Sequence, residues 1–250
     1  MNRAANSLDR SLWKGDQVNL RKTATLSGWL WIITFVASIP AFFILYAPVR
    51  DDPSLITGGG VNPTSKVALG ALLELIVIVA NIGTATVFFP ILKRQNEAGA
   101  LSYVTARVME SVFIAIGVIA MLTFLFMRQE ATGTNDLGNA FVSIYDRAFL
   151  LGPGFMVGIG NGIILGWLMY RSGLVPRGMA MLGLIGGPLI ILSGIAIMFD
   201  WIERGSSLQG IATIPEFFWE LSLGIYLLVK GFKPCPITAE IESQAVATTV

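Results

Sequence analysis

Six long apolar stretches, separated by short polar loops, dominate the pattern of hydrophobic and polar positions along this chain. A helix needs about 20 predominantly apolar residues to cross the hydrocarbon core of a bilayer. Every backbone N–H within that core also needs a partner inside the protein, which favours helices. The pattern therefore predicts an all-α, polytopic integral membrane protein. Its bundle of six transmembrane helices is expected at residues 26–49, 67–92, 102–127, 141–170, 179–200 and 211–230.

The composition agrees with a lipid environment. Of the 250 residues, 54% are hydrophobic and 13% are charged, whereas a soluble globular domain carries about 25% charged residues. The length predicts a single membrane domain over residues 1–250. The net charge of +1 offers no basic excess for nucleic acid, so the expected partner is the lipid bilayer.

The distribution of Lys and Arg predicts the orientation in the membrane. The segment 1–25, the loops after the second and fourth apolar stretches, and the tail hold most of the basic residues. The loops on the other side hold fewer basic residues and many Asp and Glu residues. We therefore expect both termini in the cytoplasm. The bundle 26–232 then lies between a cytoplasmic N-terminal segment, 1–25, and a disordered cytoplasmic tail, 233–250.

The fourth apolar stretch carries an unusual glycine pattern. Its glycines recur every four residues and would leave one face of a helix without side chains: Gly154, Gly158, Gly162 and Gly166. Such a groove lets another backbone approach closely, and the fifth stretch offers a complementary patch at Gly183 and Gly187. The groove indicates tight packing between neighbouring helices or a sliding surface. It also offers a face for a homo-oligomer or another membrane partner.

The same stretch contains Gly152-Pro153-Gly154. Proline removes a backbone donor and the flanking glycines weaken a helix. We predict a kink or break in the fourth helix there, with residues 139–151 as a separate half-helix. Broken helices at membrane depth can form ion or substrate sites, although prolines also occur in membrane helices without such a role.

Several polar side chains fall inside the predicted spans, where an ionisable group is costly and normally has a partner. We take them as candidate binding residues of a polar interior: Glu74, Asn81, Arg107, Glu110, Arg147, Asn161, Glu216 and Glu220. Arg107 and Glu110 have the spacing of an intrahelical ion pair, and the spacing equally permits Arg107 to reach a carboxylate on another helix. One interpretation is that the set ties the helices together structurally. The other is a binding or proton-relay site, in which neighbouring carboxylates shift each other's protonation.

The residue types that most often carry catalysis and metal binding are scarce. The chain has no histidine, and its one cysteine, Cys235, cannot form an internal disulfide or a Cys cluster. No hydrolase, metalloprotease or phosphate-loop motif is present. The sequence therefore indicates no catalytic residue, no metal site and no cofactor, and it argues against an enzyme without excluding one that works with carboxylates.

Five segments, taken together, resemble a known family. They are ELIVIVANIGTATVFFPILKRQ at 74–95, YVTARVME at 103–110, YRSGLVPR at 170–177, GLIGGPLIILSG at 183–194 and EFFWELSLGIYLLVKGF at 216–232. The chain is similar there to the bacterial membrane proteins of domain-of-unknown-function family 4386, over roughly residues 67–232. The resemblance implies a six-span protein of the bacterial inner (plasma) membrane. It implies no activity.

Three functions remain open. A small transporter, channel or ligand-binding sensor would use the polar interior, and it predicts that Glu74, Asn81, Asn161 and Glu220 surround one solvent-reachable cavity. A non-enzymatic membrane scaffold, or a subunit of a larger membrane complex, would use the glycine groove. An intramembrane enzyme would need a nucleophile–base pair, which no spacing in the chain supplies.

Overall fold

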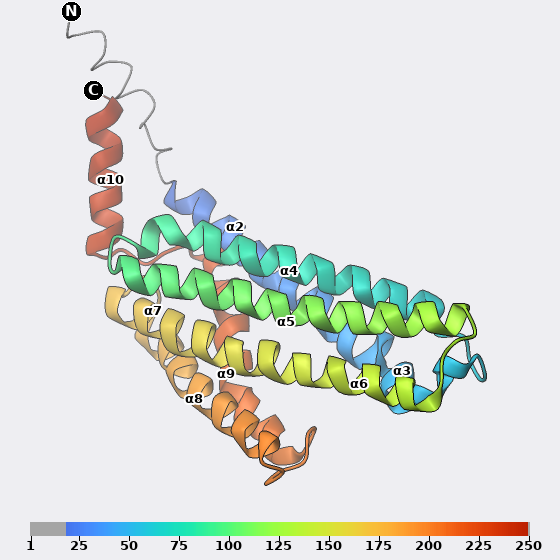
Figure 1. Cartoon of the computed structure of the whole chain (residues 1–250). Coiled ribbons are helices and arrows are strands. Elements are labelled where there is room, and N and C mark those ends of the chain that lie inside the picture. The colour runs from blue at the N-terminus through green and yellow to red at the C-terminus, as the bar shows by residue number, and fades with distance from the viewer. Residues whose placement is uncertain (1–18, 250) are drawn as a thin grey trace, which may run out of the picture.

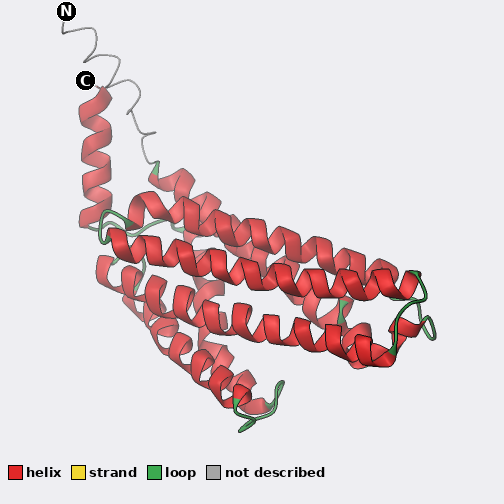
Figure 2. Ribbon diagram, in the orientation of Figure 1, coloured by secondary structure: helices red, strands yellow, loops and turns green. Residues whose placement is uncertain are grey.

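The computed structural model describes residues 19–249, and within them it consists of helices and connecting loops (Figure 2). Six helices are long and apolar enough to cross a membrane, which confirms the predicted fold class. They are α2 (Leu20–Pro40) with η1 (Ala41–Leu45), α4 (Thr64–Leu92), α5 (Glu97–Gln129), the composite fourth span Asn135–Ser172, α8 (Arg177–Met198) and α9 (Ser207–Val229). The short helices α3 (Ala47–Asp51) and η2 (Pro53–Thr57) lie in the first loop, and α10 (Pro236–Thr249) ends the chain.

Polar residues placed just before the apolar stretches begin four of these helices. The side chains of Asn19, Asn96, Thr134 and Ser206 each accept a hydrogen bond from the backbone N–H three residues later. These N-caps satisfy donors that have no partner within the first turn. The helices consequently begin a few residues before the apolar stretches, as at Leu20 and Asn135.

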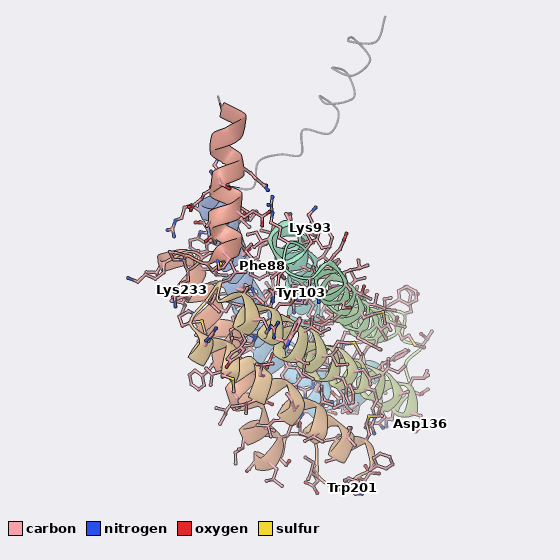
Figure 3. The ribbon with its side chains drawn as sticks, turned by 90° about the vertical axis from the view of Figure 1, so that its left-hand side faces the viewer. Phe88, Lys93, Tyr103, Asp136, Trp201 and Lys233 are labelled. Carbon is pink, nitrogen blue, oxygen red and sulfur yellow. The ribbon has the colours of Figure 1, made fainter. Side chains whose placement is uncertain are left out.

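The six spans form a closed ring in chain order. Each span packs against the next one along the chain, and α9 closes the ring by packing against α2. Figure 1 shows α4, α5 and α6 running together while α8 and α9 diverge from them at one end. We call that end distal and the opposite end, which carries α10, proximal. Lys93 and Lys233 mark the proximal end, and Asp136 and Trp201 mark the distal end (Figure 3).

Among the described residues, three apolar clusters fill the ring, two large ones on either side of its middle and a smaller one that includes Val77 and Ile114. The proximal cluster includes Phe88, Tyr103 and Trp219. The distal cluster includes Phe124 and Tyr145. The buried polar side chains of the long helices lie mostly between these clusters, at the depth where the bilayer is driest.

The fourth span is not broken, contrary to one form of the sequence-based expectation. It continues from α6 (Asn135–Phe149) through two π-helical segments, η3 (Leu150–Met156) and η4 (Gly158–Leu165), into α7 (Gly166–Ser172). The interruption at Pro153 therefore widens the helix instead of ending it. Proline cannot donate the regular helical bond, and a π-helical turn absorbs this defect while the neighbouring backbone groups stay paired. Residues 139–151 accordingly do not form a separate half-helix.

The glycine groove faces α8 of the same chain. A Cβ atom at Gly162 would lie 2.4 Å from the Cα atom of Gly187, and one at Gly158 would lie 2.8 Å from the carbonyl oxygen of Gly187. Gly166 lies against Leu184. The predicted packing against Gly187 is thus confirmed, and the expectation that this face receives a second copy or another membrane partner is wrong for these three glycines.

The tail also differs from its expectation. Instead of a disordered segment, Pro236–Thr249 form the helix α10 (Figure 1). Proline is favourable in a first helical turn, Ile241 is buried against the proximal cluster, and Arg94 donates to Gln244 at 2.8 Å. Most of the expected N-terminal segment 1–25 lies outside the described residues.

The close contact between η4 and α8 predicts the effect of an added methyl group. Gly187→Ala should lower the stability of the purified protein by about 1–3 kcal/mol, because the new Cβ meets backbone atoms that cannot move aside. Gly178→Ala on the same helix is the control, since a Cβ there meets nothing within 4 Å. Thermal unfolding in detergent measures both variants, and equal midpoints would contradict the packing.

Candidate functional site

A cavity of about 220 Å³ lies inside the ring between the two large apolar clusters. Its lining combines apolar side chains with most of the predicted polar residues. The candidates that line it are Glu74, Asn81, Arg107, Glu110, Glu216 and Glu220. They come from α4, α5 and α9, so residues up to about 146 positions apart in the chain converge on one space. We call this space the central cavity.

Arg107, Glu110 and Asn81 form a closed hydrogen-bonded triangle. Arg107 Nη1 lies 2.6 Å from Glu110 Oε2, Asn81 Nδ2 donates to Glu110 Oε1 at 2.8 Å, and Arg107 Nη2 donates to Asn81 Oδ1. All three side chains are buried, and the Arg107 guanidinium also lies 5.1 Å from the ring centroid of Trp31. This arrangement satisfies most of the hydrogen-bonding groups of a buried ion pair and joins α4 to α5.

Glu220 has one partner on the fourth span. Asn161 Nδ2 donates to Glu220 Oε1, and the main-chain oxygen of Asn161 accepts a hydrogen bond from Trp219 Nε1 at 2.9 Å. Asn161 is fully buried but does not line the central cavity itself. Asn161 therefore orients the Glu220 side chain from outside the cavity and joins η4 to α9.

Glu216 is different, because neither of its carboxylate oxygens has a hydrogen-bond partner among the described residues. The residue is only 2% exposed and lines the central cavity. Its carboxylate sits in a niche made by two glycines: a Cβ at either Gly162 or Gly186 would lie 2.8 Å from Glu216 Oε2. An unsatisfied buried carboxylate is costly, so this group marks the place where the bundle alone is incomplete.

Glu74 lies on the distal side of the same cavity. Tyr145 donates to Glu74 Oε1 at 3.0 Å, which joins α4 to α6. Among the described residues, Glu74 forms no ion pair. The central cavity is thus bordered by four carboxyl groups and one guanidinium.

The cavity opens sideways and not toward either end of the ring. The lining side chains with large exposure are Ile39, Phe43 and Phe217, which are 41%, 69% and 38% exposed. They lie on α2, η1 and α9, within segments apolar enough to span a membrane. Because such a surface faces lipid, the opening between η1 and α9 connects the cavity with the bilayer.

Two predicted site residues do not line the central cavity: Asn161, which contacts Glu220 from the fourth span, and Arg147, which lies elsewhere. Arg147 borders a separate distal pocket of about 340 Å³, together with Asp146, Asp200, Glu203 and Arg204. The expectation that Arg147 belongs to the polar interior is wrong, because its side chain is exposed and lies beside the α8–α9 loop.

Asp146 holds the distal loop to the bundle in that region. It pairs with Arg204 of the α8–α9 loop and accepts from Arg50 Nε at 3.4 Å. Burial and the neighbouring charge of Arg50 lower the pKa of Arg204 to about 10. The Arg50 guanidinium lies 3.9 Å from the ring centroid of Phe42, whose ring packs against that of Phe149 at 4.3 Å. Both rings line the central cavity, so they separate it from the distal pocket.

The sequence did not identify the apolar side chains that line the cavity. Phe42 and Phe149 carry no pattern that distinguishes them from other aromatic residues of apolar spans. Tyr145 was detectable in principle, because a tyrosine within a span needs a partner for its hydroxyl group, and Glu74 is that partner.

Comparison with known proteins gives a family and nothing beyond it. A family model described as a domain of unknown function (DUF4386) matches residues 26–231, which include every residue that lines the central cavity. No curated protein and no solved structure matches the chain.

The closed triangle predicts a strong thermodynamic coupling. Arg107→Gln should destabilise the protein by about 3–5 kcal/mol, since it leaves the Glu110 carboxylate buried without its cation. Glu110→Gln should cost a similar amount, and the double variant should cost clearly less than the sum. Unfolding of the four proteins in detergent gives this cycle, and strictly additive losses would contradict the ion pair.

Proposed function

The chain belongs to the DUF4386 family, a domain of unknown function, and for this multi-pass membrane protein we propose that its role is to bind a small ligand in the central cavity. The observation that carries the proposal is the buried carboxylate of Glu216, which has no partner within the bundle and lines an open space. A purely structural polar residue in lipid would normally be paired. A ligand supplies the missing partner.

The other polar residues of the interior fit a supporting role. Arg107, Glu110 and Asn81 satisfy one another, as a structural ion pair does. The interior thus combines a largely satisfied wall with a carboxyl group, that of Glu216, of which both oxygens lack a partner among the described residues. This division is typical of binding sites, in which a preorganised scaffold surrounds a few groups left free for the ligand.

The size of the cavity supports a small ligand. Its volume of about 220 Å³ lies below the range of about 300–1,000 Å³ for sites of drug-sized molecules. It exceeds an apolar cavity of about 150 Å³ that is large enough for benzene. A molecule of one ring and a short side chain fits this space, and the sideways opening admits it from the lipid.

The proposal favours a ligand-binding sensor, or a transporter in one of its states, over a scaffold. The glycine groove that motivated the scaffold packs against α8 of the same chain. The proposal assigns no reaction to the protein.

We further propose that the protein lies in the bacterial inner membrane with the proximal end in the cytoplasm. The proximal ends of the spans carry the larger number of basic residues: Arg21, Lys22, Lys93, Arg94, Arg171, Arg177, Lys230 and Lys233. The distal loops carry Asp51, Asp52, Glu130, Asp136, Asp200 and Glu203. Such an asymmetry favours a cytoplasmic location for the basic side.

Cysteine labelling tests this orientation. In a Cys235→Ser background, a cysteine introduced by Gly59→Cys in the distal loop should react with a membrane-impermeant maleimide in intact cells. A cysteine introduced by Ser243→Cys on α10 should react only after the membrane is opened. A Cβ at Gly59 meets no neighbour within 4 Å, and Ser243 is exposed, so both sites tolerate the change. The reverse labelling pattern would overturn the orientation.

A pair of threonine variants tests the binding cavity. Thr213 lines the central cavity, whereas Thr86 is exposed on α4, and both hydroxyl groups donate to the carbonyl oxygen four residues earlier. Thr213→Phe should fill the cavity and abolish the stabilisation that small aromatic compounds give to the native protein. Thr86→Phe should keep it. Thermal unfolding against a panel of one-ring aromatic compounds measures this, and equal responses of the two variants would contradict a binding cavity.

A further inference from the structure

We propose that the ligand of the central cavity is an organic cation, a protonated amine on a small apolar body, with the carboxylate of Glu216 as its counter-ion. This inference rests on the proposed binding function and specifies its ligand. Three observations support it: the hydrogen-bonding groups without a partner at the site, the charges of the side chains that line the cavity, and the aromatic side chains in its wall.

The open hydrogen-bonding groups of Glu216 and Asn161 are acceptors, while Arg107 Nε is an open donor of the same region. Both oxygens of Glu216 lack a donor, and so does Asn161 Oδ1, which lies on the residue that contacts Glu220. The missing partner must therefore bring N–H or O–H groups. A primary ammonium group brings three donors and no acceptor, which matches this set better than a neutral or anionic group.

The charged side chains of the cavity also favour a positively charged ligand. The single guanidinium of the cavity, Arg107, is already held by Glu110 and Asn81. Glu216 and Glu220 have no such cation, and the amide of Asn161 compensates Glu220 only in part. An anionic ligand would meet two carboxyl groups without a free cation, whereas a cationic ligand replaces the missing charge.

The walls argue for an organic cation over a bare metal ion. In the part of the chain that the structure describes, no three acidic, His or Cys side chains converge closely enough to hold a metal ion. Aromatic side chains instead face the cavity from α2, η1 and α9, namely Phe35, Phe42 and Phe217. Phe35 and Phe217 meet edge to face at 5.3 Å. Such a wall accommodates an apolar body and also attracts a cation through ring faces.

The position of the opening agrees with an amphiphilic ligand. The exposed rim at Ile39, Phe43 and Phe217 faces lipid. An amine with an apolar body partitions into the bilayer, and the rim is accessible to such a molecule from the lipid.

Benzylammonium and benzyl alcohol provide a matched pair of probes. The two molecules have nearly the same shape, and only the first carries a charge. Increasing millimolar concentrations of each are added to the purified protein, and the thermal unfolding midpoint is followed. Benzylammonium should give a saturable stabilisation with an affinity at least about tenfold higher than that of benzyl alcohol, because a charge-assisted hydrogen bond is about twice as strong as a neutral one. Sodium and potassium chloride at matched ionic strength should give no saturable shift.

Glu216→Gln is the decisive variant and Glu130→Gln is its control. Glu216 has no partner in the bundle, so the amide should fold as well as the native protein or better. It should lose the preference for benzylammonium over benzyl alcohol. Glu130 is exposed at the distal end of α5, away from the cavity, and Glu130→Gln should keep the preference.

The outcomes separate the ligand class from the binding function. If both probes stabilise the native protein equally, or if Glu216→Gln keeps the preference for the cation, the cationic ligand is overturned while the binding cavity stands. If sodium or potassium ions alone saturate the effect, an inorganic cation replaces the organic one. If no probe stabilises the native protein more than the Thr213→Phe variant, the ligand class and the proposed function fail together.

Discussion

Lipid leaves every polar group of a transmembrane helix dependent on the protein itself. Arg107, Glu110 and Asn81 meet this requirement by forming hydrogen bonds with one another. These bonds fix α4 against α5 at the depth where desolvation is most severe. Two further interior carboxyl groups reach partners across helix boundaries, Glu74 with Tyr145 and Glu220 with Asn161.

Glu216 does not meet this requirement, because its carboxyl group has no partner among the described residues. Burial of the Glu216 carboxylate without a partner is unfavourable, yet the glycines at 162 and 186 make room for it. The small residues on η4 and α8 thus have two structural effects. They let two helices approach closely, which stabilises the bundle in the absence of a hydrophobic driving force between helices, and they shape the niche of the Glu216 carboxyl group.

The space in front of this group is lined by side chains of α2, α4, α5 and α9. At the distal end the pairing of Asp146 with Arg204 keeps the α8–α9 loop attached to α6. The packed rings of Phe42 and Phe149 lie between that pairing and the central cavity. The cavity is therefore closed distally and open toward the lipid, which is the geometry expected of a site that receives its ligand from the membrane.

The sequence by itself determined the six spans, because hydrophobic length is a local property. The spacing of Arg107 and Glu110 permitted an ion pair within one helix, and the structure shows that this pair forms. The sequence also identified the ionisable residues that line the cavity, since ionisable groups inside apolar stretches are rare. Only the tertiary structure decided which of them meet, and it placed Arg147 outside the cavity, at the pocket beside the α8–α9 loop. Likewise, the partner of the glycine face and the order of α10 depend on contacts between segments far apart in the chain. Local periodicity carries no information about such contacts, because they are fixed by the packing of the whole ring.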